Sequence, residues 1–188
     1  MGKKLAGKKV AILVADGFEQ VELTEPKKAL DEAGAMTQIV SPAGGDVQGW
    51  NHDEKADKFI VDVELDWARS DDYDALLLPG GVRNPDRLRM LTRAVEFVDG
   101  FFAAGKPVAA ICHGPWTLIE GDVLKGRRVT SWPSLKTDLE NAGSTWVDRD
   151  VVVDEGLVTS RKPEDIPAFN QKMIQEFSAG RHVKQRAA

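Results

Sequence analysis

Short apolar runs alternate along the chain with segments of helical periodicity. The apolar runs predict strands at residues 10–15, 36–40, 75–78 and 107–111. These runs lack alternating polar positions, which is typical of strands buried on both faces of a sheet. The strand–helix alternation therefore predicts an α/β fold, with a mostly parallel sheet and helices on both faces.

Cap and stop residues bound the first predicted helix. Thr24 is the expected N-cap, Pro26 fits the first turn, and Gly34 is the expected stop. Apolar residues at helical spacing predict two later helices at residues 91–104 and 163–177.

Three further stretches have clear local signals. Residues 151–159 predict a hairpin that turns at Glu155 and Gly156. The Gly-rich polar stretch at 43–54 predicts a surface hairpin or excursion beside the sheet. Another helix is expected to begin over residues 114–120.

Length and charge narrow the possible classes of protein. The 188 residues predict one compact domain over 1–188, with residues 1–8 as a frayed terminus. A net charge of −5 disfavours nucleic-acid binding, and no apolar run approaches membrane-spanning length. A single cysteine cannot form an intramolecular disulfide, so a cytoplasmic location is expected.

Cys112 follows the buried run at 107–111 and precedes a predicted helix. This layout, with Ala110 and Gly114 as small flanking residues, is that of a nucleophile elbow, in which a reactive side chain projects from a strained turn. The N-terminus of the following helix and the adjacent His113 would both favour the thiolate. A lone cysteine after a strand is also a common inert core residue, but the elbow spacing favours a nucleophile.

Other strand ends carry candidate partners of the thiol. Gly80 and Gly81 could present backbone N–H groups as an oxyanion hole, or could form a plain tight turn. Glu19 and Glu22 follow the first strand, where glutamates are often solvated residues of a first helical turn. A carboxyl group beside a thiolate should instead keep its proton and donate a hydrogen bond.

Three more ionisable residues are candidates for a role at the site or at the surface. Asp86 could orient an imidazole, or could cap a helix. His52 and His182 lie far from these loops in sequence and are both expected at the surface. The expected chemistry requires neither a metal nor a cofactor.

Motifs in a consistent order over nearly the whole chain make the sequence resemble the PfpI branch of the ThiJ/PfpI superfamily. The strongest of these motifs are Asp16-Gly17-Phe18-Glu19-Gln20-Val21-Glu22, Leu78-Pro79-Gly80-Gly81, Asn84-Pro85-Asp86 and Ala110-Ile111-Cys112-His113-Gly114-Pro115-Trp116. Later matches include Thr130-Ser131-Trp132-Pro133, Asn141-Ala142-Gly143, Val151-Val152-Val153-Asp154 and Thr159-Ser160-Arg161.

The resemblance implies a flavodoxin-like three-layer sandwich and a set of site roles. Cys112 matches the nucleophile, Glu22 the acid that hydrogen-bonds the sulfur, and His113 the neighbouring imidazole. Asp86 matches an acid that completes a triad across a subunit interface, where family members commonly have the longer Glu. Gly81 and His113 would offer backbone N–H groups, and assembly as a homodimer, in some cases a hexamer, is implied.

The resemblance leaves several functions open. The first is a stress-response hydrolase that repairs proteins or nucleotides modified by glyoxal or methylglyoxal, with small aldehydes or modified proteins as substrates. An intracellular cysteine peptidase is the second, and a non-enzymatic oxidative-stress sensor or chaperone that uses Cys112 oxidation is the third. A glutamine amidotransferase is set aside, because it needs a later His-x-Glu and the only later histidine, His182, is followed by Val183-Lys184.

Overall fold

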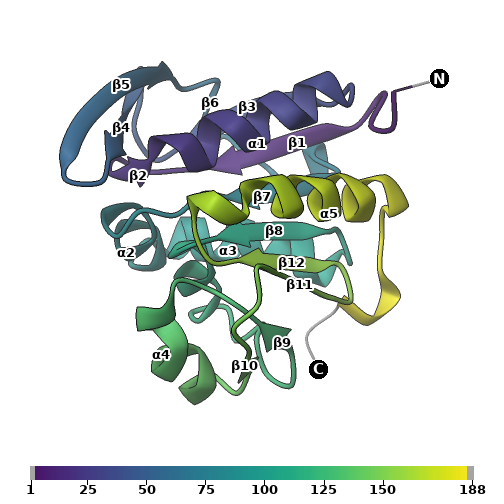
Figure 1. The fold of residues 1–188 in the computed structure, drawn as a ribbon. Helices are drawn as coiled ribbons and strands as arrows, with labels where there is room; N and C mark the ends of the chain where they lie inside the picture. Colours follow the sequence, from purple (N-terminus) through teal and green to yellow (C-terminus); the bar gives the residue numbers. More distant parts are fainter. Residues whose placement is uncertain (1–2, 186–188) are drawn as a thin grey trace.

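The computed structural model describes residues 3–185, which are built around a seven-stranded sheet (Figure 1). In spatial order the strands are β11 (Val151–Asp154), β12 (Leu157–Ser160), β8 (Val108–Ile111), β7 (Ala75–Leu78), β1 (Lys9–Leu13), β3 (Met36–Ser41) and β6 (Val63–Glu64). All neighbouring strands pair in parallel except β11 with β12. The central order β3-β1-β7-β8-β12 is the flavodoxin-like 2-1-3-4-5 order, which confirms the predicted fold class.

Helices cover both faces of this sheet. On one face lie α1 (Gln20–Glu32) and α5 (Ile166–Ala179), which contact each other and stand in front of the sheet in Figure 1. On the other face lie α2 (Arg83–Arg89), α3 (Thr92–Ala103) and α4 (Lys136–Asn141). Short 3-10 helices are η1 (Ser70–Asp72), η2 (Gly114–Leu118), η3 (Pro133–Leu135), η4 (Pro163–Asp165) and η5 (Val183–Gln185).

Two hydrophobic cores form because successive strand residues point to opposite faces. In β1, Ala11 and Leu13 pack into the core that contains the phenylalanines of α3. Val10 and Ile12 pack into the other core, with apolar residues of α1 and α5. Burial of both faces explains why the central strands read as continuous apolar runs.

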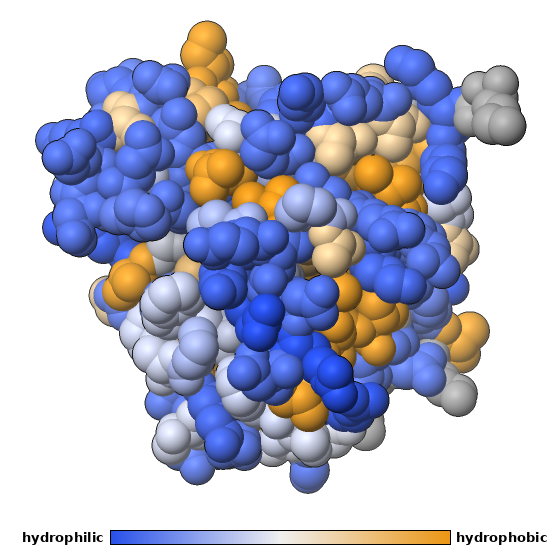
Figure 2. All heavy atoms as spheres, viewed as in Figure 1, coloured by the Kyte–Doolittle hydropathy of each residue, from blue (hydrophilic) through white to orange (hydrophobic). Residues whose placement is uncertain are grey.

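Two smaller sheets lie beside the main one. β2 (Phe18–Glu19), β4 (Asp46–Asn51) and β5 (Glu54–Ile60) form a three-stranded sheet, and β9 (Arg128–Val129) pairs with β10 (Thr145–Trp146). The β4–β5 hairpin is largely covered by hydrophilic residues in Figure 2. A hairpin in this region was predicted, although it extends further along the chain than expected.

The start of α1 differs from the prediction. The helix begins at Gln20, so Thr24 lies within it rather than at its N-cap, and Pro26 lies inside the helix. The side chain of Gln20 exchanges two hydrogen bonds of 2.8 Å with Asp57 of β5, which fixes the earlier start. The predicted stop is confirmed: Gly34 has a φ of 97°, and its N–H donates to Asp31 O in a Schellman motif.

Two other expectations about local structure were wrong. The segment at residues 3–8 is not frayed, because Leu5 is fully buried and its N–H donates to Ala33 O at 2.9 Å; residues 1–2 lie outside the described part. The helix after Cys112 does begin at Gly114 as predicted, but it is the five-residue 3-10 helix η2 and not an α-helix. The hairpin at Glu155 and Gly156 is confirmed, since both residues have positive φ between the antiparallel β11 and β12.

No helix among residues 3–185 is long and apolar enough to cross a membrane.

Candidate functional site

Cys112 sits on a strained turn at the end of β8. Its φ of 61° is uncommon for a residue with a side chain, and the turn projects the side chain out of the strand direction. The surrounding backbone holds this conformation: the Cys112 N–H donates to Ser160 O at 3.0 Å, and its C=O accepts from Trp132 N at 2.9 Å. The geometry is that of the predicted elbow.

Two glycines allow the loops to close around this turn. A Cβ on Gly80 would lie 2.5 Å from Glu22 Oε2 and 2.7 Å from Cys112 Cβ, and a Cβ on Gly114 would lie 2.5 Å from Leu78 O. These separations are shorter than carbon and oxygen atoms tolerate. Glycine at both positions therefore lets the β7 loop, the elbow and α1 approach one another.

Glu22 reaches the sulfur from the first turn of α1. Its side chain is fully buried, and Oε2 accepts a hydrogen bond of 2.9 Å from the Gly80 N–H. Burial, above all other causes, raises the pKa of Glu22 to about 8, so the carboxyl group is largely protonated at neutral pH. The Gly80 N–H is thus engaged with Glu22, and the Gly81 N–H also interacts with this carboxyl group.

The ionisation of Cys112 depends on Glu22. Cys112 is only 7% exposed, and burial together with the Glu22 carboxylate raises the pKa of the thiol. The backbone N–H groups of Gly81 and His113 face the sulfur and act in the opposite direction. A thiolate is therefore compatible with this site only while Glu22 keeps its proton, because two adjacent buried anions would repel each other.

His113 lies beside the sulfur as an uncharged imidazole. Its Nδ1 is 3.3 Å from Cys112 Sγ, while Nε2 is 3.4 Å from Ser134 Oγ. Burial lowers the pKa of His113 to about 4, so the imidazole is uncharged at neutral pH. Its ring stacks on Trp132, with centroids 6.0 Å apart and planes at 23°.

The dipole of η2 stabilises a Cys112 thiolate less than that of the predicted helix would. A five-residue 3-10 helix has few aligned peptide dipoles, so the macrodipole that was expected to favour the thiolate is small. The individual N–H groups of Gly81 and His113 favour the thiolate instead, because their hydrogen bonds lower the pKa of Cys112.

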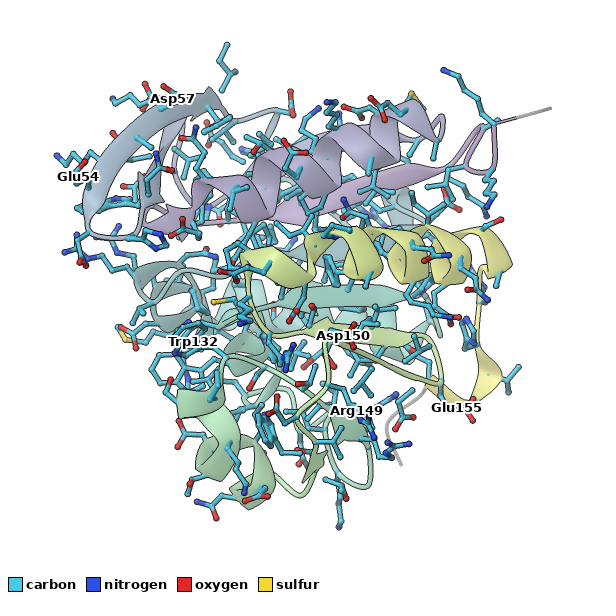
Figure 3. The ribbon with its side chains drawn as sticks, in the orientation of Figure 1. Glu54, Asp57, Trp132, Arg149, Asp150 and Glu155 are labelled. Carbon is cyan, nitrogen blue, oxygen red and sulfur yellow. The ribbon has the colours of Figure 1, made fainter. Side chains whose placement is uncertain are left out.

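The sulfur opens into a cavity of about 700 Å³. Its walls combine apolar side chains, including Val21, Val82 and Trp132, with charged groups, including Arg83, Lys162 and Glu164. Trp132 is 40% exposed and lies between α2 and α4 in Figure 3. This volume suits a small molecule or an extended side chain.

The β4–β5 hairpin also contributes to the cavity. Glu19 and His52 both line it, and Glu19 Oε2 accepts a hydrogen bond of 3.0 Å from the His52 N–H. The His52 side chain is 86% exposed, so it is a surface residue as predicted, but it lies on the rim of the site and not away from it. Because His52 lies far in sequence from the strand ends that form the site, its place on the rim could not be predicted from the sequence.

Two other candidates lie elsewhere. Asp86 is exposed in the first turn of α2 and does not line the cavity within this chain. His182 was expected at the surface, but its side chain is only 23% exposed and its Nε2 lies 3.1 Å from Glu176 Oε2.

Asn84 is a site-supporting residue that the sequence analysis did not single out. It is fully buried, and its Oδ1 accepts from Ala15 N at 2.7 Å. Its Nδ2 donates to the C=O groups of Pro79 and Gly80 at 2.9 and 3.0 Å. It thereby joins the end of β1 to the loop that carries Gly80.

Comparisons with known proteins agree on one family. The model of the DJ-1/PfpI family matches residues 8–176. A Bacillus subtilis protein named "Putative cysteine protease YraA" is 47% identical over 89% of this chain and 96% of its own length. General stress protein 18 of Bacillus subtilis is 46% identical over the same shares, and a deglycase from Pyrococcus abyssi is 45% identical over 88% and 97%.

Solved structures of this type resemble the chain closely. Drosophila melanogaster DJ-1beta has a TM-score of 0.82 and 28% identity, covering 91% of this chain and 90% of that one. A two-domain protein from Anabaena variabilis, with DJ-1/ThiJ/PfpI-like and ferritin-like domains, has a TM-score of 0.83 and 34% identity. The match covers 89% of this chain and 47% of that longer one.

Proposed function

This chain belongs to the DJ-1/PfpI family, and on that premise we propose that it is a stress-response cysteine hydrolase acting on glyoxal- and methylglyoxal-modified proteins or nucleotides. One observation carries the proposal: a buried carboxyl group and a neutral imidazole flank the only cysteine, at the wall of a cavity. Relatives named as a general stress protein and a deglycase support the same reading.

The three residues take distinct roles in this proposal. Cys112 is the nucleophile, and its thiol proton passes to Nδ1 of His113, which lies 3.3 Å away. Glu22 keeps its own proton and donates a hydrogen bond to the thiolate. The N–H groups of Gly81 and His113 face the sulfur, and in this proposal they donate to the developing oxyanion.

The reaction balances without a cofactor. A methylglyoxal adduct R–NH–CH(OH)–CO–CH₃ and one water give the free amine R–NH₂ and lactate. Attack by Cys112 forms a C–S bond as the C–N bond breaks, and His113 returns the proton to the departing amine. A proton then moves from the sulfur-bound carbon to the neighbouring ketone carbon, which gives a lactoyl thioester, and water hydrolyses its C–S bond. One adduct carbon is oxidised and its neighbour is reduced, so no external oxidant or reductant is required.

The test compares wild type with Cys112→Ala on methylglyoxal adducts of N-acetylarginine and N-acetylcysteine. We expect the variant to release the free amino acids at least about a hundredfold more slowly, because the nucleophile is lost. Equal clearance by the two proteins would contradict the proposal. Circular dichroism of both proteins establishes that the variant is folded.

A cysteine peptidase is the second candidate, favoured by the 47% identical relative whose name includes cysteine protease. Here Asp86, exposed on α2, would reach the His113 of a second copy in a homodimer or hexamer and complete a triad. The same protein samples can be offered a reduced, alkylated protein substrate. Cleavage that weakens in Asp86→Ala would support this candidate, and a wild type that leaves the substrate intact would eliminate it.

A further inference from the structure

We infer that Ser134 is the outer end of a proton path that leads from the buried Cys112 thiol through His113 to solvent. The inference rests on the proposed role of Cys112 as nucleophile, and it adds a residue that acts through His113. The first observation is that the three residues differ in solvent exposure: Cys112 and His113 are buried, whereas Ser134 is exposed.

The two nitrogens of His113 connect these ends. Nδ1 lies 3.3 Å from Cys112 Sγ, and Nε2 lies 3.4 Å from Ser134 Oγ, so the imidazole bridges the thiol and the hydroxyl. A hydroxyl can donate and accept at once. Each contact can therefore carry a proton in the outward direction.

The charge state of His113 explains why a path is needed. Burial lowers the pKa of this imidazole to about 4, so an imidazolium that simply kept the thiol proton would be unfavourable at neutral pH. A relay avoids that charge. The thiol proton moves to Nδ1, the proton on Nε2 moves to Ser134 Oγ, and the hydroxyl proton moves to water.

This sequence of transfers balances and changes the tautomer of His113. Before the transfer Nε2 carries the proton and Nδ1 accepts from the thiol. Afterwards Nδ1 carries the proton and donates to the thiolate, while the Ser134 hydroxyl donates to Nε2. One proton has left the site, and the imidazole stays neutral throughout.

The surrounding segment holds Ser134 in place. Ser134 belongs to η3, and the preceding Trp132 stacks on the His113 ring and donates its N–H to Cys112 O at 2.9 Å. The neighbouring Ser131 donates its hydroxyl to Trp132 O at 2.8 Å and accepts from Trp146 Nε1 at 3.0 Å. The hydroxyl of Ser134 is thus presented to His113 by a segment fixed to the elbow itself.

The first test needs no turnover. Nitrogen-15 NMR of the His113 ring, assigned with a His113→Asn variant, is recorded below and above the pH at which Cys112 ionises. We expect the proton to lie on Nε2 below that pH and on Nδ1 above it. An imidazole protonated on both nitrogens after ionisation, or one whose tautomer does not change, would overturn the inference.

The second test compares three serine variants during turnover of the N-acetylarginine adduct. Ser134→Ala should lower kcat roughly three- to tenfold with KM unchanged, as expected for the loss of one hydrogen-bonded step. Ser134→Thr, which keeps the hydroxyl, should restore kcat. Ser178→Ala, an exposed serine near the C-terminal end of α5, is the matched control.

The outcomes separate this inference from the proposed function. A kcat of Ser134→Ala equal to that of Ser178→Ala would overturn the relay even if the wild type clears adducts. A wild type that clears no adduct but shows the tautomer change would remove the proposed function and leave the relay supported.

Discussion

Two buried ionisable side chains at the site have pKa values moved in opposite directions by the same cause. Burial raises the pKa of Glu22 from 4.5 to about 8 and lowers that of His113 from 6.5 to about 4, because it disfavours the charged form of each. Both groups are therefore largely neutral at pH 7. Because Glu22 carries no negative charge at this pH, it does not repel an anion beside it. The proposed function places one negative charge on Cys112.

These shifts have opposite effects on stability. Between about pH 4.5 and 8, folded Glu22 keeps a proton that the unfolded chain has lost, so the free energy of unfolding falls as pH rises. Between about pH 4 and 6.5, the unfolded chain holds a proton that folded His113 lacks, so the free energy of unfolding rises with pH. The two trends oppose each other up to pH 6.5. Above that pH the Glu22 trend is opposed by Cys112, because a folded thiol that ionises below its unfolded pKa makes the free energy of unfolding rise with pH.

We therefore predict a specific pH dependence for Glu22→Gln. In a Cys112→Ala background, which removes the titration of the thiol itself, the free energy of unfolding should fall by up to roughly 1.4 kcal/mol per pH unit from pH 6.5 to 8, and adding Glu22→Gln should abolish this slope. Urea unfolding at several pH values measures both. Adding Glu25→Gln instead, an exposed position on the same helix, should leave the slope unchanged. Parallel slopes with and without Glu22→Gln would contradict the prediction.

At the scale of elements, the site depends on how closely three segments approach. The β7 loop, the elbow and the first turn of α1 meet where Gly80 lies against Glu22 and Cys112. The sequence predicted the elbow and the strand ends, because a buried run followed by Cys112 and Gly114 is a local signal. It did not predict that α1 begins at Gln20, since a contact with β5 fixes that start and overrides the local preference for a cap at Thr24.

Gly80→Ala tests this close approach. The added methyl group would overlap Glu22, Cys112 and the carbonyl of Ile111, so we expect a loss of about 1–3 kcal/mol in the free energy of unfolding. Gly44→Ala is the control, because its Cβ would meet only the end of the Glu64 side chain in an exposed loop. Urea unfolding of the two variants should separate them. Equal stability would show that the loops are less tightly joined than described.

Across the whole molecule, the parallel sheet brings distant residues to one edge. Glu22 follows β1, Gly80 follows β7 and Cys112 follows β8, and all three strand ends meet at the same side of the sheet. The sequence could predict this meeting, because strand–helix alternation implies parallel strands. It could not predict the place of His52 or Ser134, because the turn of the β4–β5 hairpin and the short helix η3 reach the site through tertiary packing that no local sequence signal encodes.

The central claim is that Cys112 forms a thiolate while the adjacent Glu22 keeps its proton. It is tested most directly by the rate of Cys112 alkylation with iodoacetamide as a function of pH, followed by intact mass. The chain has one cysteine, so the mass change reports this thiol alone. A protonated Glu22 removes the repulsion that raises the pKa of the thiol and donates a hydrogen bond to the sulfur, alongside the N–H groups of Gly81 and His113. We predict that these donors outweigh burial and give a midpoint clearly below the free-cysteine pKa of about 8.5; a midpoint at or above that value would contradict the account.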